Sequence, residues 1–394
     1  MVPSPSLDPF KWYRKMQQEM PVYYDAEFML NWGDQGAWQV FRYEDVKRVL
    51  SEYNTFSNEY APQSDDHLAS KALISRDPPV HRRLRSLISK AFIPKVINKL
   101  EPWVRTLCEE LLQPHLESGK IEFVKEYAVP IPVSVICQLL GVPSDSHPQV
   151  HKWSTIITSN PGEIEGVSIE EAVKAYFSAQ KSLENVFREL VEKRKVTPQN
   201  DLISELIEAE SDGQHLTTDE VIGFCIVLLI AGNETTANLI SSAMLTFIEH
   251  PELQNRLIEN PSDLPRAIDE VLRYRAPVQS MFRITKQDTE INGQKIKKGE
   301  YVIAWIGSAN HDPTIFPNPE IFDINRDTQG MTSFGHGIHY CIGAPLARLE
   351  ARVAFEVLFK HIEKIRLQDH ASLSVQPSTL VYSLASLPIT FQKR

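Results

Sequence analysis

Cys341 stands at the end of a glycine-containing loop, directly before a helix predicted over Ala344–Lys360. The segment from Phe334 to Gly343 reads Phe-Gly-His-Gly-Ile-His-Tyr-Cys-Ile-Gly. A thiolate at a helix N-terminus is stabilised by the free backbone N–H groups and by the positive end of the helix dipole. Gly335 and Gly337 leave room for a flat group to lie against the backbone. The pattern predicts a cysteine held as an anion beside a large planar cofactor.

Two other interpretations of the same loop are open at this point. A single cysteine is most often a small buried apolar residue. His336, His339 and Cys341 are also three potential zinc ligands within one loop. Zinc sites usually combine two CxxC or HxxxH pairs, and the sequence contains no second pair.

A second group of reactive side chains lies inside a long apolar helix predicted over Thr218–His250. Thr217 and Glu220 have the spacing of a capping box at its start. Its centre reads Ala-Gly-Asn-Glu-Thr-Thr over residues 231–236, and glycine and paired threonines are unfavourable inside a helix. A Thr hydroxyl that bonds back to a carbonyl opens a helix locally. Such a conflict marks a functional site more often than an accident, although a core helix with a surface glutamate is the simpler alternative.

Glu270 and Arg273 stand three residues apart on a helix predicted over Asp263–Tyr274, so their side chains share one face. Arg326 follows later, after the proline- and phenylalanine-containing segment 316–322. Taken alone, a Glu-x-x-Arg pair is also typical of a surface ion pair that adds very little stability.

His81 and Arg85 are one turn apart on a basic helix predicted over Val80–Phe92, so they point the same way. Two such donors suit an anionic group, because charge-assisted hydrogen bonds are the strong ones. The adjoining Arg82 and Arg83 make a solvated basic face the alternative interpretation.

These segments, taken in their order along the chain, resemble the cytochrome P450 family over nearly the whole sequence. The resemblance implies a mainly α fold, an α-rich triangular prism with small β-sheets, and a single domain over residues 1–394. It also implies haem b (heme b, iron protoporphyrin IX) between the central helix and the helix after the cysteine loop. Cys341 matches the axial iron ligand of the family.

The resemblance also assigns roles residue by residue. Glu234 matches the acid position and Thr235 the alcohol position of the oxygen-binding segment, where they supply protons and a hydroxyl. Glu270, Arg273 and Arg326 match the residues that brace the cysteine loop from behind. The remaining haem contacts implied are His81, Arg85, Ala231, Arg283, Phe334, Gly335, His339 and Gly343. Candidate substrate contacts are Ile74, Ile230 and Val278, each of which is equally explicable as ordinary core.

The soluble bacterial branch of the family implies a monooxygenase that uses O₂ to hydroxylate a small-to-medium hydrophobic substrate, such as a terpenoid, steroid or fatty acid. Electrons would come from a ferredoxin or flavodoxin with its reductase, because the sequence has no flavin or nicotinamide glycine motif and no cysteine cluster. The alternatives are a peroxygenase, an isomerase or dehydratase, a non-catalytic haem sensor, and a zinc-bound scaffold. Peroxide-dependent relatives tend to lack the acid–alcohol pair, which favours the monooxygenase.

Composition sets further limits. The 394 residues are 42% hydrophobic and 23% charged, which is typical of a soluble globular protein with a large core. The net charge of −10 argues against general nucleic-acid binding. Met1–Lys15 has no signal-peptide pattern, and the most apolar stretch, Val221–Ala231, is too short to cross a bilayer. The four cysteines are widely spaced, as in a reducing compartment. We therefore expect a cytoplasmic monomer without a membrane anchor.

Apolar periodicity and turn residues predict the other elements. Loops over residues 54–76 and 155–178 are expected to form a lid. Helices are predicted over Tyr43–Ser51, Glu101–Glu117, Ile131–Leu140 and Glu170–Lys195, strands around Ala37–Phe41, Tyr301–Ile306 and Pro388–Phe391, and a hairpin turn over Ile291–Gln294.

Overall fold

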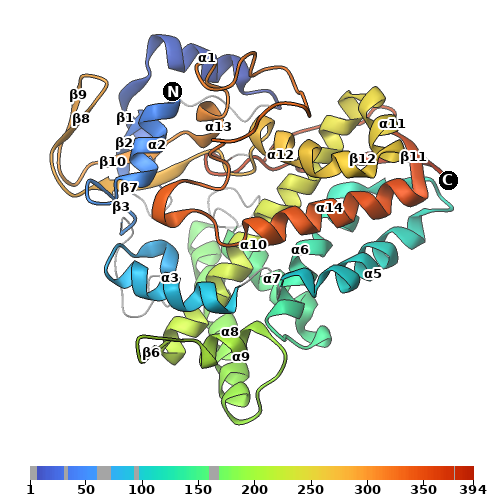
Figure 1. Cartoon of the computed structure of the whole chain (residues 1–394), viewed down its shortest axis with the longest axis horizontal. Helices are drawn as coiled ribbons and strands as arrows, with labels where there is room; N and C mark the ends of the chain where they lie inside the picture. The colour runs from blue at the N-terminus through green and yellow to red at the C-terminus, as the bar shows by residue number, and fades with distance from the viewer. Residues whose placement is uncertain (1–6, 31–33, 60–71, 93–96, 159–167, 377) are drawn as a thin grey trace. The chain divides into compact units, whose positions relative to one another are not determined.

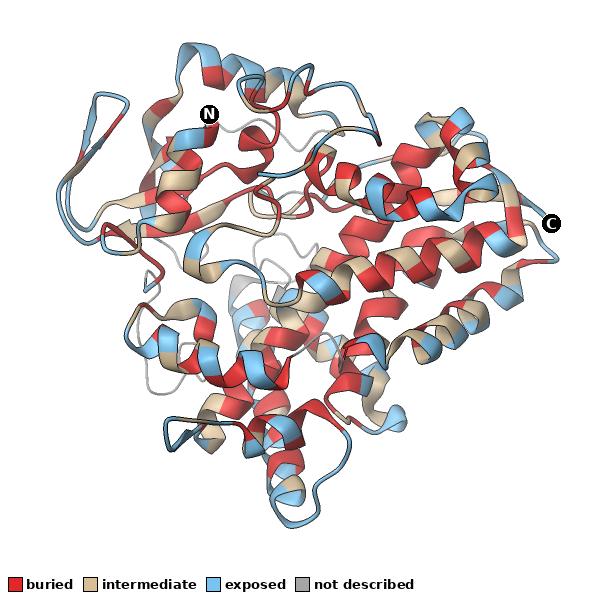
Figure 2. Ribbon diagram, in the orientation of Figure 1, coloured by how far each residue is buried: buried red, intermediate tan, exposed pale blue. Residues whose placement is uncertain are grey.

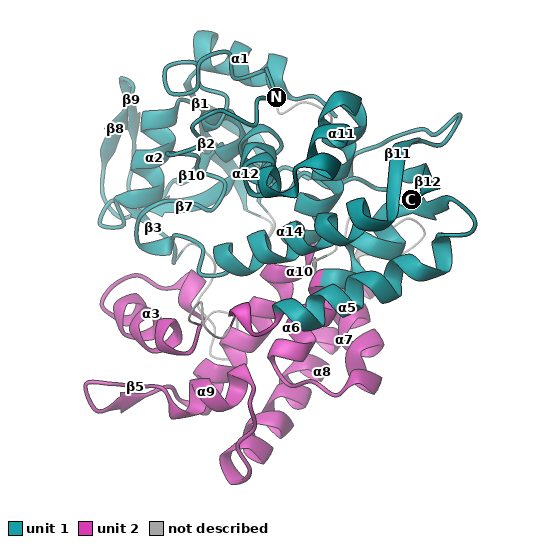
Figure 3. Cartoon of the chain, turned by 45° about the vertical axis from the view of Figure 1, so that its right-hand side comes forward, with its two compact units in different colours: residues 1–60, 101–131, 235–394 teal, residues 61–100, 132–234 magenta. Residues whose placement is uncertain are grey.

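The structure is a computed structural model that describes residues 7–30, 34–59, 72–92, 97–158, 168–376 and 378–394. The described residues are mainly helical and carry several small sheets, as the sequence predicts. They group into two compact units (Figure 3). The larger unit comprises residues 1–60, 101–131 and 235–394, and the smaller unit comprises residues 61–100 and 132–234. A single domain over residues 1–394 stays a prediction.

The larger unit contains a five-stranded sheet with the order β1-β2-β10-β7-β3. β2 and β10 pair in parallel, and the other neighbours are antiparallel. The sheet packs on a cluster of buried apolar side chains that includes Val40, Val302 and Phe316. Its strands are β1 (Val22–Met29), β2 (Gln35–Val40), β3 (Phe56–Ser57), β7 (Met281–Thr285) and β10 (Tyr301–Ala304).

The helices of this unit include α14 (Ala344–His361), which follows the cysteine loop and packs along α5 (Glu101–Leu112) (Figure 1). α14 begins after Gly343 with Pro345 in its first turn, where no backbone N–H is needed. The other elements of the unit are α1 (Phe10–Glu19), α2 (Tyr43–Ser51), α11 (Pro251–Glu259), α12 (Leu264–Tyr274), α13 (Ile306–Ala309), β4 (Lys120–Glu122), β8 (Thr289–Ile291), β9 (Gln294–Ile296), β11 (Ile362–Leu367) and β12 (Pro388–Lys393).

The smaller unit is mainly helical, and two of its helices begin with side-chain caps. Ser168 and Glu171 form a reciprocal capping box at the start of α8, and Asp201 caps α9 by accepting the Ser204 N–H at 2.9 Å. Its elements are α3 (Val80–Ala91), most of α6 (Pro130–Leu139), α7 (His147–Thr158), α8 (Ile169–Val196), α9 (Leu202–Glu208), β5 (Glu210–Ser211) and β6 (Gln214–His215).

The central helix α10 runs unbroken from Thr218 to Glu249. Residues up to Glu234 belong to the smaller unit, and residues from Thr235 belong to the larger unit. The helix is long and apolar enough to cross a membrane by length and composition alone, but 61% of its most apolar window is buried inside the structure. Every position from Thr236 to Phe247 is buried, as expected of a core helix (Figure 2).

Most predicted elements are confirmed to within a few residues, and the exceptions have local causes. The helix predicted over Glu101–Glu117 is α-helical only to Leu112 and continues as a 3-10 turn that contains Pro114. The strand predicted over Tyr301–Ile306 ends at Ala304, because Ile306 already begins α13.

The predicted lid loops are only partly confirmed. Residues 155–158 belong to α7 and residues 169–178 to α8, so the loop predicted over residues 155–178 is wrong there. The structure places Phe56–Ser57 in β3 and Leu73–Ser75 in a 3-10 turn, within the loop predicted over residues 54–76. Residues 60–71 and 159–167 of these loops lie outside the described residues.

The capping box at the start of α10 gives a stability prediction. Thr217 Oγ1 accepts the Glu220 N–H at 3.2 Å, and Glu220 Oε2 accepts the Thr217 N–H at 2.9 Å. Thr217→Ala removes the side-chain cap and is expected to lower the free energy of unfolding by about 1 kcal/mol in urea denaturation. Thr106→Ala is the control, because that hydroxyl bonds only within its own helix, to the Pro102 carbonyl. Equal stability of the two variants would contradict the prediction.

Candidate active site

The loop that carries Cys341 is held by its own backbone. The Cys341 N–H donates to the Phe334 carbonyl at 2.9 Å, and the Tyr340 N–H donates to the Gly337 carbonyl at 3.1 Å. Gly335 and Gly337 have φ of 74° and 71°, in the left-handed region that favours glycine. A Cβ atom on Gly337 would lie 2.9 Å from the Ser51 Cα atom, so no larger residue fits against α2. The turn therefore needs glycine at this position.

Cys341 differs from the other cysteines in its surroundings. All four cysteines lie in the described residues, and only Cys341 is exposed. Burial raises the pKa of Cys108 and Cys137 to about 12 and also raises the pKa of Cys225. A Cβ atom on Gly343, the residue before α14, would lie 3.7 Å from Cys341 Sγ. Cys341 is thus an exposed thiol two residues before the N-cap of a long helix, which is the setting of a reactive or metal-binding cysteine.

Arg283, His339 and Phe334 carry the N–H donors and the aromatic ring that a flat anionic cofactor requires. Arg283 is buried on β7 and donates to the Phe282 carbonyl at 2.7 Å, and His339 ends a 3-10 turn next to Tyr340. The Arg348 guanidinium lies 4.6 Å from the centre of the Phe334 ring. Among the described residues, no three His, Cys, Asp or Glu side chains form a group that could hold a metal ion. The zinc alternative therefore has no ligand cluster in this part of the chain.

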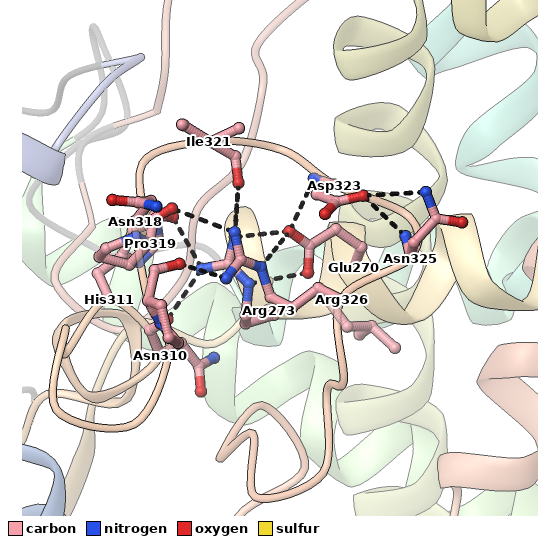
Figure 4. A network of polar contacts seen from close by, with 12 residues as sticks. Glu270, Arg273, Asn310, His311, Asn318, Pro319, Ile321, Asp323, Asn325 and Arg326 are labelled. Atoms are coloured by element: carbon pink, nitrogen blue, oxygen red, sulfur yellow. Dashed lines mark hydrogen bonds and ion pairs between the residues drawn. The ribbon is translucent and has the colours of Figure 1, made fainter.

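Glu270 and Arg273 on α12 form an ion pair with no exposed surface (Figure 4). Arg273 donates to both carboxylate oxygens, at 2.7 and 2.8 Å, and Arg326 Nε donates to the same carboxylate at 3.1 Å. Arg273 Nη1 also donates to the carbonyls of Asn310 and Pro319, at 3.0 and 2.9 Å. The structure thus brings the three predicted bracing residues together. Because neither side chain has exposed surface, this is not a surface ion pair. Backbone carbonyls of a distant segment supply further hydrogen-bond partners for Arg273.

Three predicted residues of the smaller unit, His81, Arg85 and Ile74, lie on α3 or just before it. His81 is buried, and the pKa of its imidazole is lowered by burial and by the neighbouring Arg85, with Asp77 acting in the opposite direction. Arg83 on the same helix forms an ion pair with Glu220. Ile74 lies in the 3-10 turn before α3 and is 41% exposed. An exposed isoleucine is not ordinary core.

The predicted residues of α10 follow one another along the helix. Ala231 is exposed, while Ile230, Glu234 and Thr235 are half-buried. Burial raises the pKa of the Glu234 carboxyl, so this group holds its proton to a higher pH than a free glutamate does. The Gly and Thr residues predict a local opening of the helix, but α10 is continuous across this segment. Val278 is half-buried after α12 and forms a β-bridge with Val381.

Three polar residues that the sequence analysis did not name lie behind the cysteine loop. Asn310, Thr332 and Ser333 are buried, and the Asn310 side chain is hydrogen-bonded to each of the other two. Asn310 is more than 20 residues from the other two, so no local spacing connects them. Asn310 does follow a predicted strand, but only the folded chain shows which loop its amide contacts.

Comparison with known proteins assigns the class. A model of the cytochrome P450 family matches residues 8–381. The putative cytochrome P450 YjiB of Bacillus subtilis (strain 168) is 39% identical over 388 residues, which cover 97% of this chain and 93% of that protein. The vitamin D(3) 25-hydroxylase of Pseudonocardia autotrophica is 34% identical, with coverage of 92% and 89%.

The substrate-free crystal structure of CYP109E1 from Bacillus megaterium has a TM-score of 0.92 at 38% identity, with 98% of this chain and 99% of that chain covered. The chain belongs to the cytochrome P450 family. Within it, the chain is similar to CYP109 enzymes of bacilli. Membership confirms the predicted fold class, the haem-thiolate cofactor and the monooxygenase class of enzyme.

The buried ion pair on α12 gives a second stability prediction. Glu270→Ala leaves the Arg273 charge buried without its carboxylate, which typically costs about 3–5 kcal/mol, so we expect little soluble, haem-loaded protein. Asp269→Ala is a matched control on the same helix, because it breaks only the partly exposed ion pair with Arg348. The readouts are soluble yield and urea denaturation. Similar soluble yield and similar stability of the two variants would show that the buried pair contributes no more to stability than the partly exposed one.

Proposed function

We propose that this P450 hydroxylates a steroid or another hydrophobic molecule of similar size, with Cys341 as the iron ligand. The observation that carries the proposal is the position of Cys341, an exposed thiol just before the N-cap of α14 and after two left-handed glycines. Support for the substrate class comes from relatives. CYP109E1 of Bacillus megaterium has been crystallised with corticosterone and with testosterone, and another relative is a vitamin D(3) 25-hydroxylase. Terpenoids and fatty acids are the other candidate substrates.

Haem bound by this chain supplies the chemistry that inserts one atom of O₂ into a C–H bond. Cys341 would hold its iron, and the thiolate would be stabilised by the first N–H groups of α14. His81, Arg85, Arg283 and His339 carry the N–H donors that two propionates require. Phe334, Gly335, Gly343 and Ala231 would lie against the flat ring.

We propose that Glu234 donates protons to the reaction and that Thr235 assists it. Glu234 lies on the central helix next to Thr235 in the sequence. Because burial raises the pKa of its carboxyl, this group can still be protonated at a pH where a free glutamate is ionised. A general acid works best when its pKa approaches the working pH, so burial improves Glu234 for this task. The adjacent hydroxyl would orient the carboxyl that donates the proton. The same pair argues against a peroxygenase.

The substrate and partners of the enzyme are part of the proposal. Ile74, Ile230 and Val278 would give apolar contacts to the substrate, which suits a molecule with few polar groups. A ferredoxin or flavodoxin with its reductase would deliver electrons one at a time. The cysteines form no disulfide, which supports a cytoplasmic enzyme, and we propose that it works as a monomer.

The absorbance difference spectrum of the reduced protein with carbon monoxide tests the site. The wild-type chain is expected to show a Soret band strongly red-shifted from that of histidine-ligated haem, and Cys341→Ser is expected to lose it. Cys137→Ala is the control, because this buried thiol lies on α6 and should leave the band in place. A red-shifted band in Cys341→Ser would refute the ligand assignment. Product formed with peroxide alone, and none with a ferredoxin system, would favour the peroxygenase.

A pH profile tests the role of Glu234. Because burial raises the pKa of its carboxyl, turnover that uses its proton should fall as pH rises through that pKa. Glu234→Gln does not titrate, so this fall should disappear and the rate at low pH should drop about 100-fold. Glu252→Gln, an exposed residue on α11, should keep the wild-type profile. The rate of product formation as a function of pH is the measurement, and an unchanged profile in Glu234→Gln would count against the assignment.

A further inference from the structure

Asn310 joins the Arg273 guanidinium to the segment that leads into the cysteine loop. It is completely buried at the end of α13, where its backbone carbonyl accepts from Arg273 Nη1 (Figure 4). Its side-chain Oδ1 accepts the Thr332 N–H at 2.7 Å and the Thr332 hydroxyl at 3.0 Å. Its Nδ2 donates to Ser333 Oγ at 2.7 Å. One residue thus contacts Arg273 with its main chain and the loop with its side chain.

The chemistry of these contacts requires a carboxamide in one orientation. The Thr332 backbone N–H can only donate, so the atom that faces it must be Oδ1. The Ser333 hydroxyl donates its single proton to the Leu272 carbonyl at 2.6 Å, so it must accept from Nδ2. Aspartate at 310 would have no donor for Ser333, and an apolar residue would leave both Thr332 and Ser333 short of a partner.

The segment held by Asn310 continues directly into the contacts of Cys341. Ser333 precedes Phe334, whose carbonyl accepts the Cys341 N–H. Thr332 has no exposed surface and Ser333 is 6% exposed, so water has little access to replace a lost hydrogen bond. A shift of this segment would therefore be passed on to Phe334 and to the position of the thiol.

We propose that Asn310 and Ser333 are positioning residues that hold the loop in the conformation that presents the Cys341 thiolate to the haem iron. The inference rests on the proposed role of Cys341 as the ligand. Arg273 and Asn310 form the fixed end of the link, because α12 and α13 are both packed in the core of the larger unit. Ser333 lies on the loop side of the link and is held by two hydrogen bonds, one to Asn310 and one to the Leu272 carbonyl of α12.

The test compares carbon monoxide difference spectra of reduced, haem-loaded variants in increasing urea. Spectra are taken only where circular dichroism shows each variant to be fully folded. In Ser333→Ala and in Asn310→Asp, we expect the ratio of the ordinary-position Soret band to the red-shifted band to rise about fivefold over wild type, as loss of one buried hydrogen bond predicts. The reduction potential of the haem, measured on the same samples, is expected to shift in both variants.

Ser308→Ala is the matched control. Ser308 is also a buried serine, on α13 itself, and its hydroxyl donates to the Phe41 carbonyl at 2.9 Å, away from the cysteine loop. This variant is expected to lose similar stability and keep the wild-type ratio. An unchanged ratio in Ser333→Ala, or an equal rise in Ser308→Ala, overturns the proposal. If Asn310→Asp yields no folded protein, Ser333→Ala decides alone. Absence of the red-shifted band in wild type would instead overturn the proposed function.

Discussion

The buried ion pair between Glu270 and Arg273 is the constraint on which the cysteine side of this P450 depends. Two opposite charges without exposed surface are costly to desolvate, and they are tolerated only when every donor and acceptor finds a partner. Here the partners are Arg326 and backbone carbonyls from the segment between α13 and the cysteine loop. The hydrogen bonds that this ion pair requires thus hold the irregular chain between α13 and the cysteine loop in place.

The irregular stretch needs this organisation because it has little secondary structure of its own. Between the end of α13 at Ala309 and the start of α14 at Ala344, the only helical element is the 3-10 turn Gly337–His339. Such a chain loses much conformational entropy on folding and cannot recover it from a regular ladder of hydrogen bonds. Side-chain contacts of Asn310, Ser333 and Arg326 replace that ladder. In the proposed arrangement, polar core contacts rather than a strand or helix set the position of the Cys341 sulfur.

Local signals in the sequence predicted local structure well. The capping box of Thr217, the Asn292-Gly293 turn and the apolar periodicity of α14 each depend on residues close together in the chain, and the structure has all three elements. The helix predicted over Glu170–Lys195 is confirmed as α8, and the Ser168 capping box that starts it shows that the loop predicted over residues 155–178 is too long. The Asn310–Ser333 contact had no such signal, because its partners come together only through tertiary packing. The roles of residues such as Glu234 came from family resemblance, which neither spacing nor burial can replace.

The three buried cysteines have a consequence for the lifetime of the enzyme. A monooxygenase that reduces O₂ without oxidising its substrate releases peroxide next to its own chain. Peroxide attacks thiolates far faster than thiols. Cys108, Cys137 and Cys225 are inaccessible, and their raised pKa values keep them protonated at neutral pH. Cys341 is the one cysteine exposed to peroxide, so oxidative damage to cysteine would fall on the proposed iron ligand.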